Sequence, residues 1–499
     1  MKKILLAIGV ITLLSNQLKA QVSDEDVLRF SQLSFGGTAR SMGAGGAFGS
    51  LGGDFSSLSN NPAGLGIYKH GEFSFSPSFV GIKTSSDFIQ TNTIDRKYNF
   101  NISNLGVVWC VPVANDNSKW KSWNFGIGEN RLNNYHERVS ITGFNPDNSL
   151  LDRFLEDANS GSGINPSDIG DGMPFTAGLA YNTYLINPLP SDSNYYDGVI
   201  GAGAVQQTEN ITYKGATNEW VFSVAGNYND KLYLGATWGI PSLYYSEERN
   251  HNETDVNNIW DGFQSFNFHE NISQRGAGMN GKFGLIYKLN DYFRFGVATH
   301  TPTFYWMTSK YSTSMDASLD SAQTSWSSPE GHFQYNLITP WRLIGSASVI
   351  FGKYGFLSAD YEWIDYSSGS VDFNYGASSN EIAAGNQINT LVQTKYRANS
   401  NLRLGGEIAL NIFRIRAGYS ISNTPFAENQ NADGADYSRN SISGGLGIRE
   451  GNYFLDLGMI HTKGNQYYQP YSLANQLVPG ATIEKSSTNI VVTVGLRFN

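Results

Sequence analysis

Charged residues in the last quarter of the chain have a spacing that could do chemistry within a sheet. Arg403 and Glu407, and then Arg414 and Arg416, alternate with apolar residues, so each pair falls on one face of a strand. Such a face could line a charged pore. Its charges could equally form ion pairs that fill the interior of a closed sheet. The pattern leaves both interpretations open.

The motifs of catalysis and of metal binding are missing from the sequence. The 7 histidines are scattered, and none has the His-Glu-x-x-His spacing of a zinc site. No Gly-x-Ser-x-Gly nucleophile elbow and no Walker A loop occurs. We therefore expect no enzyme, no metal and no cofactor. A barrel hydrolase that assembles its site from separate strands is the alternative.

A further group of residues could bind an apolar ligand. Large apolar side chains interrupt polar segments that lie between the expected strands. Such side chains cost solubility unless they pack together or hold a ligand. Packing within the loops and a ligand site among the outer loops are both open. The residues are Phe175, Leu179, Leu185, Ile186, Trp260, Phe263, Phe266 and Phe268.

The elements that must position these residues are β-strands. From about residue 71, apolar residues recur at every second position, which builds one hydrophobic sheet face. No stretch of the sequence approaches eighteen uninterrupted apolar residues, so helical membrane spans are excluded. A closed barrel is the β arrangement that leaves no unpaired edge in lipid. We predict an all-β, antiparallel transmembrane β-barrel. The last strand shows the period best, with Ile490, Val492, Val494, Leu496 and Phe498 on one side.

Connection lengths indicate the orientation of the strands. Short turns rich in Asn, Asp and Gly join strands in pairs. Short turns on one side and long loops on the other are typical of an outer-membrane barrel, whereas a soluble two-sheet sandwich, the alternative, has less one-sided connections. The expected long loops are about 248–277, 309–332, 374–391, 424–439 and 465–486.

The same asymmetry predicts the number of strands. Residues 71–83, 97–113 and 120–140 supply three strands before one outer loop at 141–217, where Ser149 to Asp157 and Phe175 to Ile186 would be short helices. The total is then about 14 strands, an even number as such barrels require. Two more strands at 173–185 and 197–208 would give about 16, which is the alternative.

Two segments precede the barrel. Residues 1–20 have a basic start, an apolar run and a small residue at the end, which is the layout of a signal peptide. Residues 21–70 are rich in glycine, which favours tight turns over long regular elements. Interspersed Phe48, Phe55 and Leu58 make this segment more apolar than a flexible linker, the alternative. We interpret it as a small irregular domain, followed by the β-barrel at 71–499.

Overall composition adds two exclusions. The net charge of -9 argues against nucleic acid as a partner. The single cysteine, Cys110, cannot form an internal disulfide, so stability must come from the hydrogen-bonded ladder. A mean hydropathy of -0.31 would suit a soluble protein, but lumen-facing residues dilute the apolar ones in a barrel.

The signal, the Gly-rich segment with Asn61, Pro62 and Ala63, the long barrel and the aromatic near its end together resemble the FadL/TodX family of outer-membrane transporters for hydrophobic compounds. The resemblance covers nearly the whole chain. It implies that residues 21–70 form a hatch that plugs the barrel, with Asn61, Pro62 and Ala63 as the hatch motif. It also implies a lateral opening in the third strand, where Gly126 and Gly128 fall.

The resemblance implies a function as well. It predicts passive transport of hydrophobic small molecules, long-chain fatty acids first and aromatic hydrocarbons second, captured in a groove among the outer loops. The expected location is the bacterial cell outer membrane, with membrane lipid and a hydrophobic ligand as partners and a monomeric barrel. The alternative is a FadL-like barrel that serves protein secretion of the type IX kind.

Overall fold

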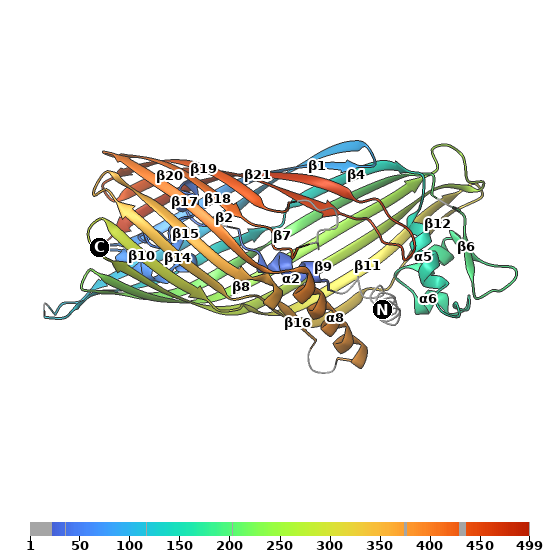
Figure 1. Cartoon of the computed structure of the whole chain (residues 1–499), viewed down its shortest axis with the longest axis horizontal. Helices are drawn as coiled ribbons and strands as arrows, with labels where there is room; N and C mark the ends of the chain where they lie inside the picture. The colour runs from blue at the N-terminus through green and yellow to red at the C-terminus, as the bar shows by residue number, and fades with distance from the viewer. Residues whose placement is uncertain are drawn as a thin grey trace.

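A long closed barrel of antiparallel strands dominates the molecule, with the N-terminal segment inside it and a helical lobe at one end (Figure 1). This computed structural model describes residues 22–34, 36–115, 117–201, 203–373, 377–428 and 436–498. The expected signal peptide lies outside the described residues. Among the described helices, none combines the length and the apolar character needed to cross a bilayer.

The wall has 14 strands, which confirms the prediction. The third, seventh, eighth and ninth strands are each interrupted once, and β21 pairs with β1 from Phe498 to Thr482, which closes the barrel. In chain order the strands are β1 (Gly71–Phe88), β2 (Thr91–Pro112), β3 (Trp120–Asn134) with β4 (Glu137–Asn145), β7 (Val205–Tyr228), β8 (Leu232–Thr254), β9 (Phe263–Lys288), β10 (Phe293–His300) with β11 (Phe304–Leu319), β13 (Gly331–Ile338) with β14 (Arg342–Ile350), β15 (Gly355–Asp365) with β16 (Ser370–Asp372), β17 (Ala398–Leu410), β18 (Phe413–Ser422), β19 (Arg439–Glu450), β20 (Tyr453–Tyr468) and β21 (Ala481–Phe498).

Helices occupy the segment before the barrel and the outer connections. The alternative of 16 strands is wrong. Residues 173–185 contain helix α7, and residues 197–208 form no separate wall strand, because β7, which is already counted, begins only at Val205. The remaining elements are α2 (Asp24–Ser31), α3 (Ala39–Gly43), α4 (Ser57–Asn60), η2 (Pro62–Ile67), α5 (Leu150–Ala158), α6 (Ile169–Gly172), α7 (Ala177–Asn182), β5 (Ile186–Pro188), β6 (Tyr196–Gly198), β12 (Gln323–Ser327), η3 (Tyr366–Ser368) and α8 (Ser379–Lys395).

Several expected outer loops are largely strand, which corrects the prediction. β8 continues to Thr254 and β9 begins at Phe263, so their connection is far shorter than expected. The connections at 141–217, 309–332 and 465–486 shorten in the same way. The apolar period fades in these segments because outward side chains such as Glu248 and Asn250 are polar, yet the backbone ladder continues. These parts of the strands therefore rise beyond the apolar belt.

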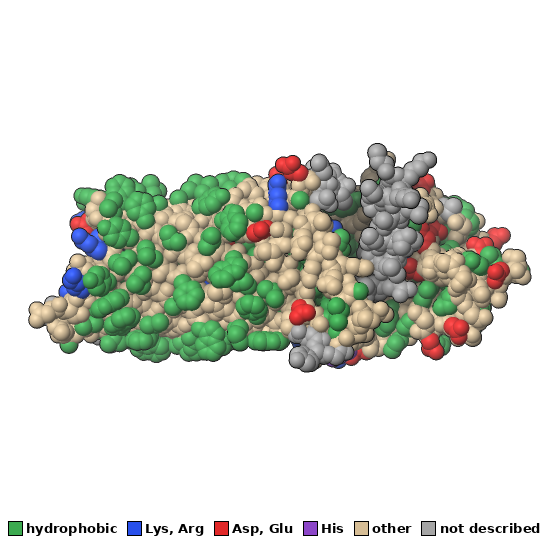
Figure 2. All heavy atoms as spheres, turned by 60° about the horizontal axis from the view of Figure 1, so that its bottom comes forward, with side chains coloured by type: hydrophobic (Ala, Val, Ile, Leu, Met, Phe, Trp, Pro, Cys, Tyr) green, Lys and Arg blue, Asp and Glu red, His purple; other side chains and the backbone are tan. Residues whose placement is uncertain are grey.

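The belt itself is visible on the outer surface. Figure 2 shows hydrophobic side chains gathered over the half of the molecule away from the helical lobe, whereas most acidic side chains lie toward the end that carries the lobe. Outward Trp238, Phe283 and Phe295 are about half exposed, while inward Asn104 and Asp360 are buried. An apolar outside and a polar, filled inside are the pattern of a wall that faces lipid.

Residues 38–68, here called the interior segment, cross the inside of the barrel. Helix α3 contacts β19, β20 and β21, whereas η2 contacts β7, β8 and β9 on the other side. The Ala39 amide donates to Oγ1 of Thr493 at 2.7 Å, and the Gly49 amide donates to Oδ2 of Asp360 at 2.9 Å. Lumen-facing side chains thus replace water as partners of the irregular backbone.

Candidate functional site

The Asn-Pro-Ala triplet begins the 3-10 helix η2. Oδ1 of Asn61 accepts a hydrogen bond from the Ala63 amide at 3.1 Å, and Pro62 occupies the first helical position, where no amide is needed. Nδ2 of Asn61 donates to the Gly49 carbonyl at 2.5 Å and to the Leu285 carbonyl at 3.3 Å. Asn61 therefore ties the interior segment to itself and to β9.

Two paired glycines in the wall make room for this triplet. Gly235 of β8 lies opposite Gly284 of β9. A Cβ at Gly235 would come within 2.3 Å of the Pro62 carbonyl carbon, and one at Gly284 would come within 1.9 Å of Oδ1 of Asn61. Larger residues at either position would push the triplet off the wall.

Gly126 and Gly128 also make room for the interior segment, whereas the sequence led us to expect a lateral opening of the third strand there. At both glycines β3 is paired with β2 on one side and with β7 on the other. A Cβ at Gly126 would meet Leu58 at 2.6 Å, and one at Gly128 would meet Phe55 at 2.5 Å. These glycines therefore accommodate the apolar side chains of the interior segment.

The charged residues singled out in the sequence form ion pairs in the lumen. Nε of Arg416 lies 2.7 Å from Glu407, and its Nη1 lies 2.7 Å from Asp456; the Arg416 and Asp456 side chains are both 0% exposed. Arg414 approaches Glu407 at 3.9 Å. Arg403 binds Glu362 further up the lumen. The ion-pair interpretation is therefore the one that the structure supports.

Helix α2 fills the lumen above the interior segment. Its Phe30 ring makes edge-to-face contacts with Tyr135 and Tyr245, at centroid distances of 5.9 and 5.6 Å. Its Arg29 guanidinium lies 4.6 Å from the centre of the Tyr245 ring. We call the surrounding group the aromatic chamber, which comprises Tyr135, Tyr245, Tyr305, Met307, Phe333, Tyr335 and Phe373.

Polar contacts hold α2 in the aromatic chamber. Asp24 accepts hydrogen bonds from Lys395 at 2.9 Å and from Tyr396 at 3.0 Å, both at the end of α8. Asp26 accepts one from Gln274 of β9 at 3.1 Å, and Arg342 donates to the Ser31 carbonyl. The helix is therefore fixed to side chains rather than joined to a sheet.

A pocket of ≈ 80 Å³ lies between α2, the interior segment and the wall. Arg131, Arg342 and Arg403 line it together with one carboxylate, Glu362, and with His300, which donates from Nε2 to the Asn60 carbonyl at 2.8 Å. We call it the lumenal pocket. Its lining carries more positive than negative charge.

Arg131 supplies the unbalanced charge. Arg342 and Arg403 both bind Glu362, so one carboxylate serves two guanidinium groups. Among the described residues Arg131 forms no ion pair, and its Nε and Nη1 atoms are buried without a hydrogen-bond partner. Buried guanidinium groups without acceptors are costly, so an anion in this pocket would be stabilised.

The wall is interrupted beside the lumenal pocket. Beyond the pair Asn104 and Asn130, the outer half of β2 pairs with β1 alone, and β4 pairs with β7 alone. The third strand breaks between Asn134 and Glu137. Outward Phe100 is 69% exposed beside this gap, which places an apolar surface there. We call this absence of strand pairing between β2 and the β3–β4 strand the wall gap.

The chain before the interior segment follows the inner edge of this gap. The Ser34 amide donates to the Leu132 carbonyl at 3.0 Å, and Nδ2 of Asn133 donates to the Gln32 carbonyl at 3.1 Å. The aromatic chamber, the lumenal pocket and the wall gap are therefore neighbours. Residues 32–34 separate the last two.

Most of the apolar residues expected at a ligand site come together in the outer lobe. Leu179, Leu185 and Ile186 pack with Phe263, Phe266 and Phe268, and Trp260 packs at the edge of the same cluster. Phe175 lies apart and contacts Tyr311 at a centroid distance of 4.6 Å. The six cluster members are buried, so in this structure they pack against one another.

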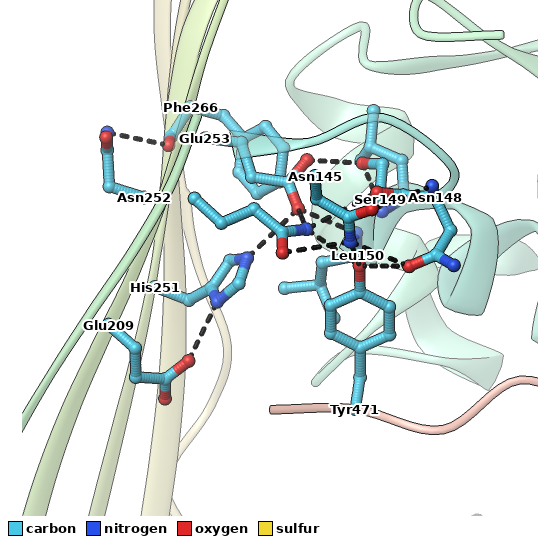
Figure 3. Close-up of polar contacts among 12 residues, drawn as sticks. Asn145, Asn148, Ser149, Leu150, Glu209, His251, Asn252, Glu253, Phe266 and Tyr471 are labelled. Carbon is cyan, nitrogen blue, oxygen red and sulfur yellow. Dashed lines mark hydrogen bonds and ion pairs between the residues drawn. The ribbon is translucent and has the colours of Figure 1, made fainter. Parts of the chain in front are cut away.

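A buried polar group attaches the lobe to the barrel. Figure 3 shows His251 of β8 between Glu209 and Glu253, at 2.8 Å from Nδ1 and 3.0 Å from Nε2. Glu253 also accepts hydrogen bonds from Ser149 and from the Leu150 amide at 2.8 Å, at the start of α5.

Electrostatics favour the charged form of this histidine. Burial disfavours the imidazolium, but the hydrogen bonds to Glu209 and Glu253 outweigh it and raise the pKa of His251 to about 10. The site lies above the apolar belt. One imidazolium therefore neutralises part of the charge of two buried carboxylates.

Sequence reasoning missed α2 and most of the lumenal pocket. Arg131 lies near the end of β3, at the register shift before the break in the third strand, and no motif in the sequence marks it. Within the described chain no group of three or more His, Cys, Asp or Glu residues could hold a metal ion.

The fold and interior define a class of protein, the outer-membrane type of β-barrel with a polypeptide segment inside. Within that class, the chain has the fold of a Pseudomonas aeruginosa FadL homologue, at a TM-score of 0.56 and 12% identity over 94% of this chain and 99% of the other. The Pseudomonas putida toluene transporter TodX is similar at a TM-score of 0.54 and 13% identity over 93% and 99%. No protein-family model and no curated sequence matches the chain.

Proposed function

We propose that this protein is a passive transporter of hydrophobic small molecules in the bacterial outer membrane, with long-chain fatty acids as the substrate class. The observation that carries the proposal is the succession of aromatic chamber, positively charged lumenal pocket and wall gap. The shared fold with a toluene transporter and a FadL homologue supports transport of apolar compounds. Those structures do not favour protein secretion.

The charge of the lumenal pocket supports a carboxylate substrate. Arg131 has donors without acceptors, and a fatty acid carboxylate would accept two parallel hydrogen bonds from such a group. The alkyl chain would lie against the aromatic chamber, where each buried CH₂ contributes about 0.8 kcal/mol. A neutral aromatic hydrocarbon would use the aromatic chamber alone.

The route that we propose begins in the outer lobe and ends in the membrane. The apolar cluster around Leu179 and Phe266 would first capture the substrate when the lobe opens. Displacement of α2 would admit it to the aromatic chamber. The hatch, residues 21–70, would close the lumen below, so the substrate would leave through the wall gap rather than through Gly126 and Gly128. Each barrel would act as a monomer.

The test is uptake of radiolabelled oleate by cells with and without the protein. The proposal requires that uptake depends on the barrel and that Arg131→Gln lowers it several-fold. Lys214→Gln, at an exposed ion pair, is the matched control and should leave uptake unchanged.

Toluene uptake separates the two substrate classes. It should be unaffected by Arg131→Gln, because a hydrocarbon presents no charge to the lumenal pocket. Oleate uptake that is equal with and without the protein would refute the transport proposal. Dependence on the barrel without sensitivity to Arg131→Gln would leave transport standing and refute the carboxylate assignment.

A further inference from the structure

We infer that the outer face of the barrel holds a site for the phosphate group of an anionic membrane lipid, centred on Arg275. The site is a hollow with a volume of ≈ 470 Å³, lined by Leu243, Tyr244, Arg275, Gly276, Trp306 and Thr308. It lies on the outside of the wall and takes no part in the proposed transport route.

Three adjacent strands bring these side chains together. Tyr244 of β8 is paired with Arg275 of β9, and Arg275 is paired on its other side with Thr308 of β11. Arg275 is exposed, and Tyr244 and Trp306 are 39% and 54% exposed. Because paired residues share a face of the sheet, all four groups project outward around the same point.

The guanidinium in this hollow has no acidic partner. Among the described residues no carboxylate forms an ion pair with Arg275, whose guanidinium carbon lies 4.9 Å from the centre of the Tyr244 ring. Other outward lysines nearby are paired, since Lys310 lies 2.7 Å from Glu330 and Lys214 lies 2.6 Å from Glu248. Arg275 therefore keeps its five N–H donors available for an anion from outside the chain.

The hollow lies at the edge of the apolar belt. Toward the belt, the next outward residues are Trp306, Phe304 and Met279, all large and exposed. Away from the belt, they are Ser273 and the charged Lys310. Lipid head groups lie at this boundary, where Trp and Tyr are enriched and where an arginine costs only about 0–1 kcal/mol.

This position identifies the occupant as a lipid rather than a soluble anion. A guanidinium binds phosphate through two parallel hydrogen bonds, and an indole presents an apolar face to an acyl chain. In one lipid molecule the phosphate would meet Arg275 while the first acyl carbons lie on Trp306 and Phe304. A free phosphate ion would leave the apolar part of the hollow empty.

The test is native mass spectrometry of the full chain in detergent, titrated with dioleoylphosphatidylglycerol, with zwitterionic dioleoylphosphatidylcholine and with inorganic phosphate. We expect one phosphatidylglycerol to be retained more tightly than phosphatidylcholine. Arg275→Gln should weaken its retention roughly tenfold, the scale of one charge-assisted hydrogen bond. Arg275→Lys should fall between, because it keeps the charge and loses the planar fork.

Lys310→Gln is the matched control, because it removes the same charge two residues beyond Thr308 and outside the hollow. Equal retention by Arg275→Gln and the unchanged protein would overturn the inference. So would an equal loss in Lys310→Gln, which would mean bulk charge, or full competition by inorganic phosphate, which would mean a free-anion site. A heat-modifiable gel shift establishes that each variant barrel is folded.

Discussion

Replacing Gly284 by alanine tests whether the interior segment closes the barrel. A Cβ at this position would lie 1.9 Å from Oδ1 of Asn61 and 2.9 Å from the Ala63 amide nitrogen. The first distance is about 1.5 Å short of ordinary contact at 3.4 Å. Backbone atoms of β9 cannot retreat that far inside a ladder paired on both sides. Asn61 must therefore move away from its position against β9.

The cost follows from the hydrogen bonds that Asn61 would lose. They join it to the Gly49 carbonyl, the Leu285 carbonyl and the Ala63 amide. At about 0.5–1.5 kcal/mol each, three neutral hydrogen bonds amount to roughly 2–4 kcal/mol. That range corresponds to roughly a 30- to 700-fold rise in the ratio of molecules with the interior segment displaced to molecules with it bound against the wall.

The assay is single-channel conductance of the purified protein in a planar bilayer. We expect long closed periods for the unchanged protein and frequent large openings for Gly284→Ala. Gly345→Ala is the matched control, because a Cβ at Gly345 has no atom within 4 Å. If both variants conduct alike while both barrels remain folded, the interior segment is not the closing element and the reasoning fails.

Four further predictions rest on individual contacts. His251→Leu should loosen the outer lobe by about 3–5 kcal/mol, because it leaves the buried Glu253 without a cation and Glu209 with Arg249 alone. Hydrogen exchange in α5 measures this, with exposed His332→Leu as control. Because the pKa of His251 is raised to about 10 in the docked lobe, its contribution is complete below about pH 6.5 and is lost as the pH rises through 10. The protection of the α5 amides against exchange, relative to unstructured peptide at the same pH, should therefore be lower at about pH 10 than at about pH 6. Asp456→Asn should destabilise the barrel by about 3–5 kcal/mol, since Arg416 would keep a buried charge with one partner fewer; the denaturant midpoint measures it, and a shift no larger than that of exposed Asp316→Asn would contradict it. Phe30→Ala should weaken the seat of α2 and speed uptake, and an unchanged rate in folded barrels would mean that α2 does not obstruct the lumen.

The sequence by itself determined the kind of wall and predicted about 14 strands, and the structure excluded the alternative of about 16. Lipid requires apolar side chains outside, and the pleat makes successive side chains alternate between the two faces. The two-residue period from Ile490 to Phe498 can therefore be recognised without knowing which strands lie next to it. The Asn-Pro-Ala triplet was singled out by the family resemblance, whereas its role as the start of η2, with Asn61 as the cap, came from the structure. Above the apolar belt the pleat still alternates the side chains, but the outward ones no longer need to be apolar, and there the strands at 248–254 and 263–277 were mistaken for loops.

Tertiary structure alone decided what the interior contains. Arg131 became a candidate site because the fold places it beside Arg342 and Arg403, more than two hundred residues away in the chain. The wall gap depends on which strands fail to pair, and pairing is a relation between distant segments. Composition alone left open whether the apolar residues of the outer loops pack together or bind a ligand. Their burial against one another is a property of three-dimensional packing, which a period along one segment does not record.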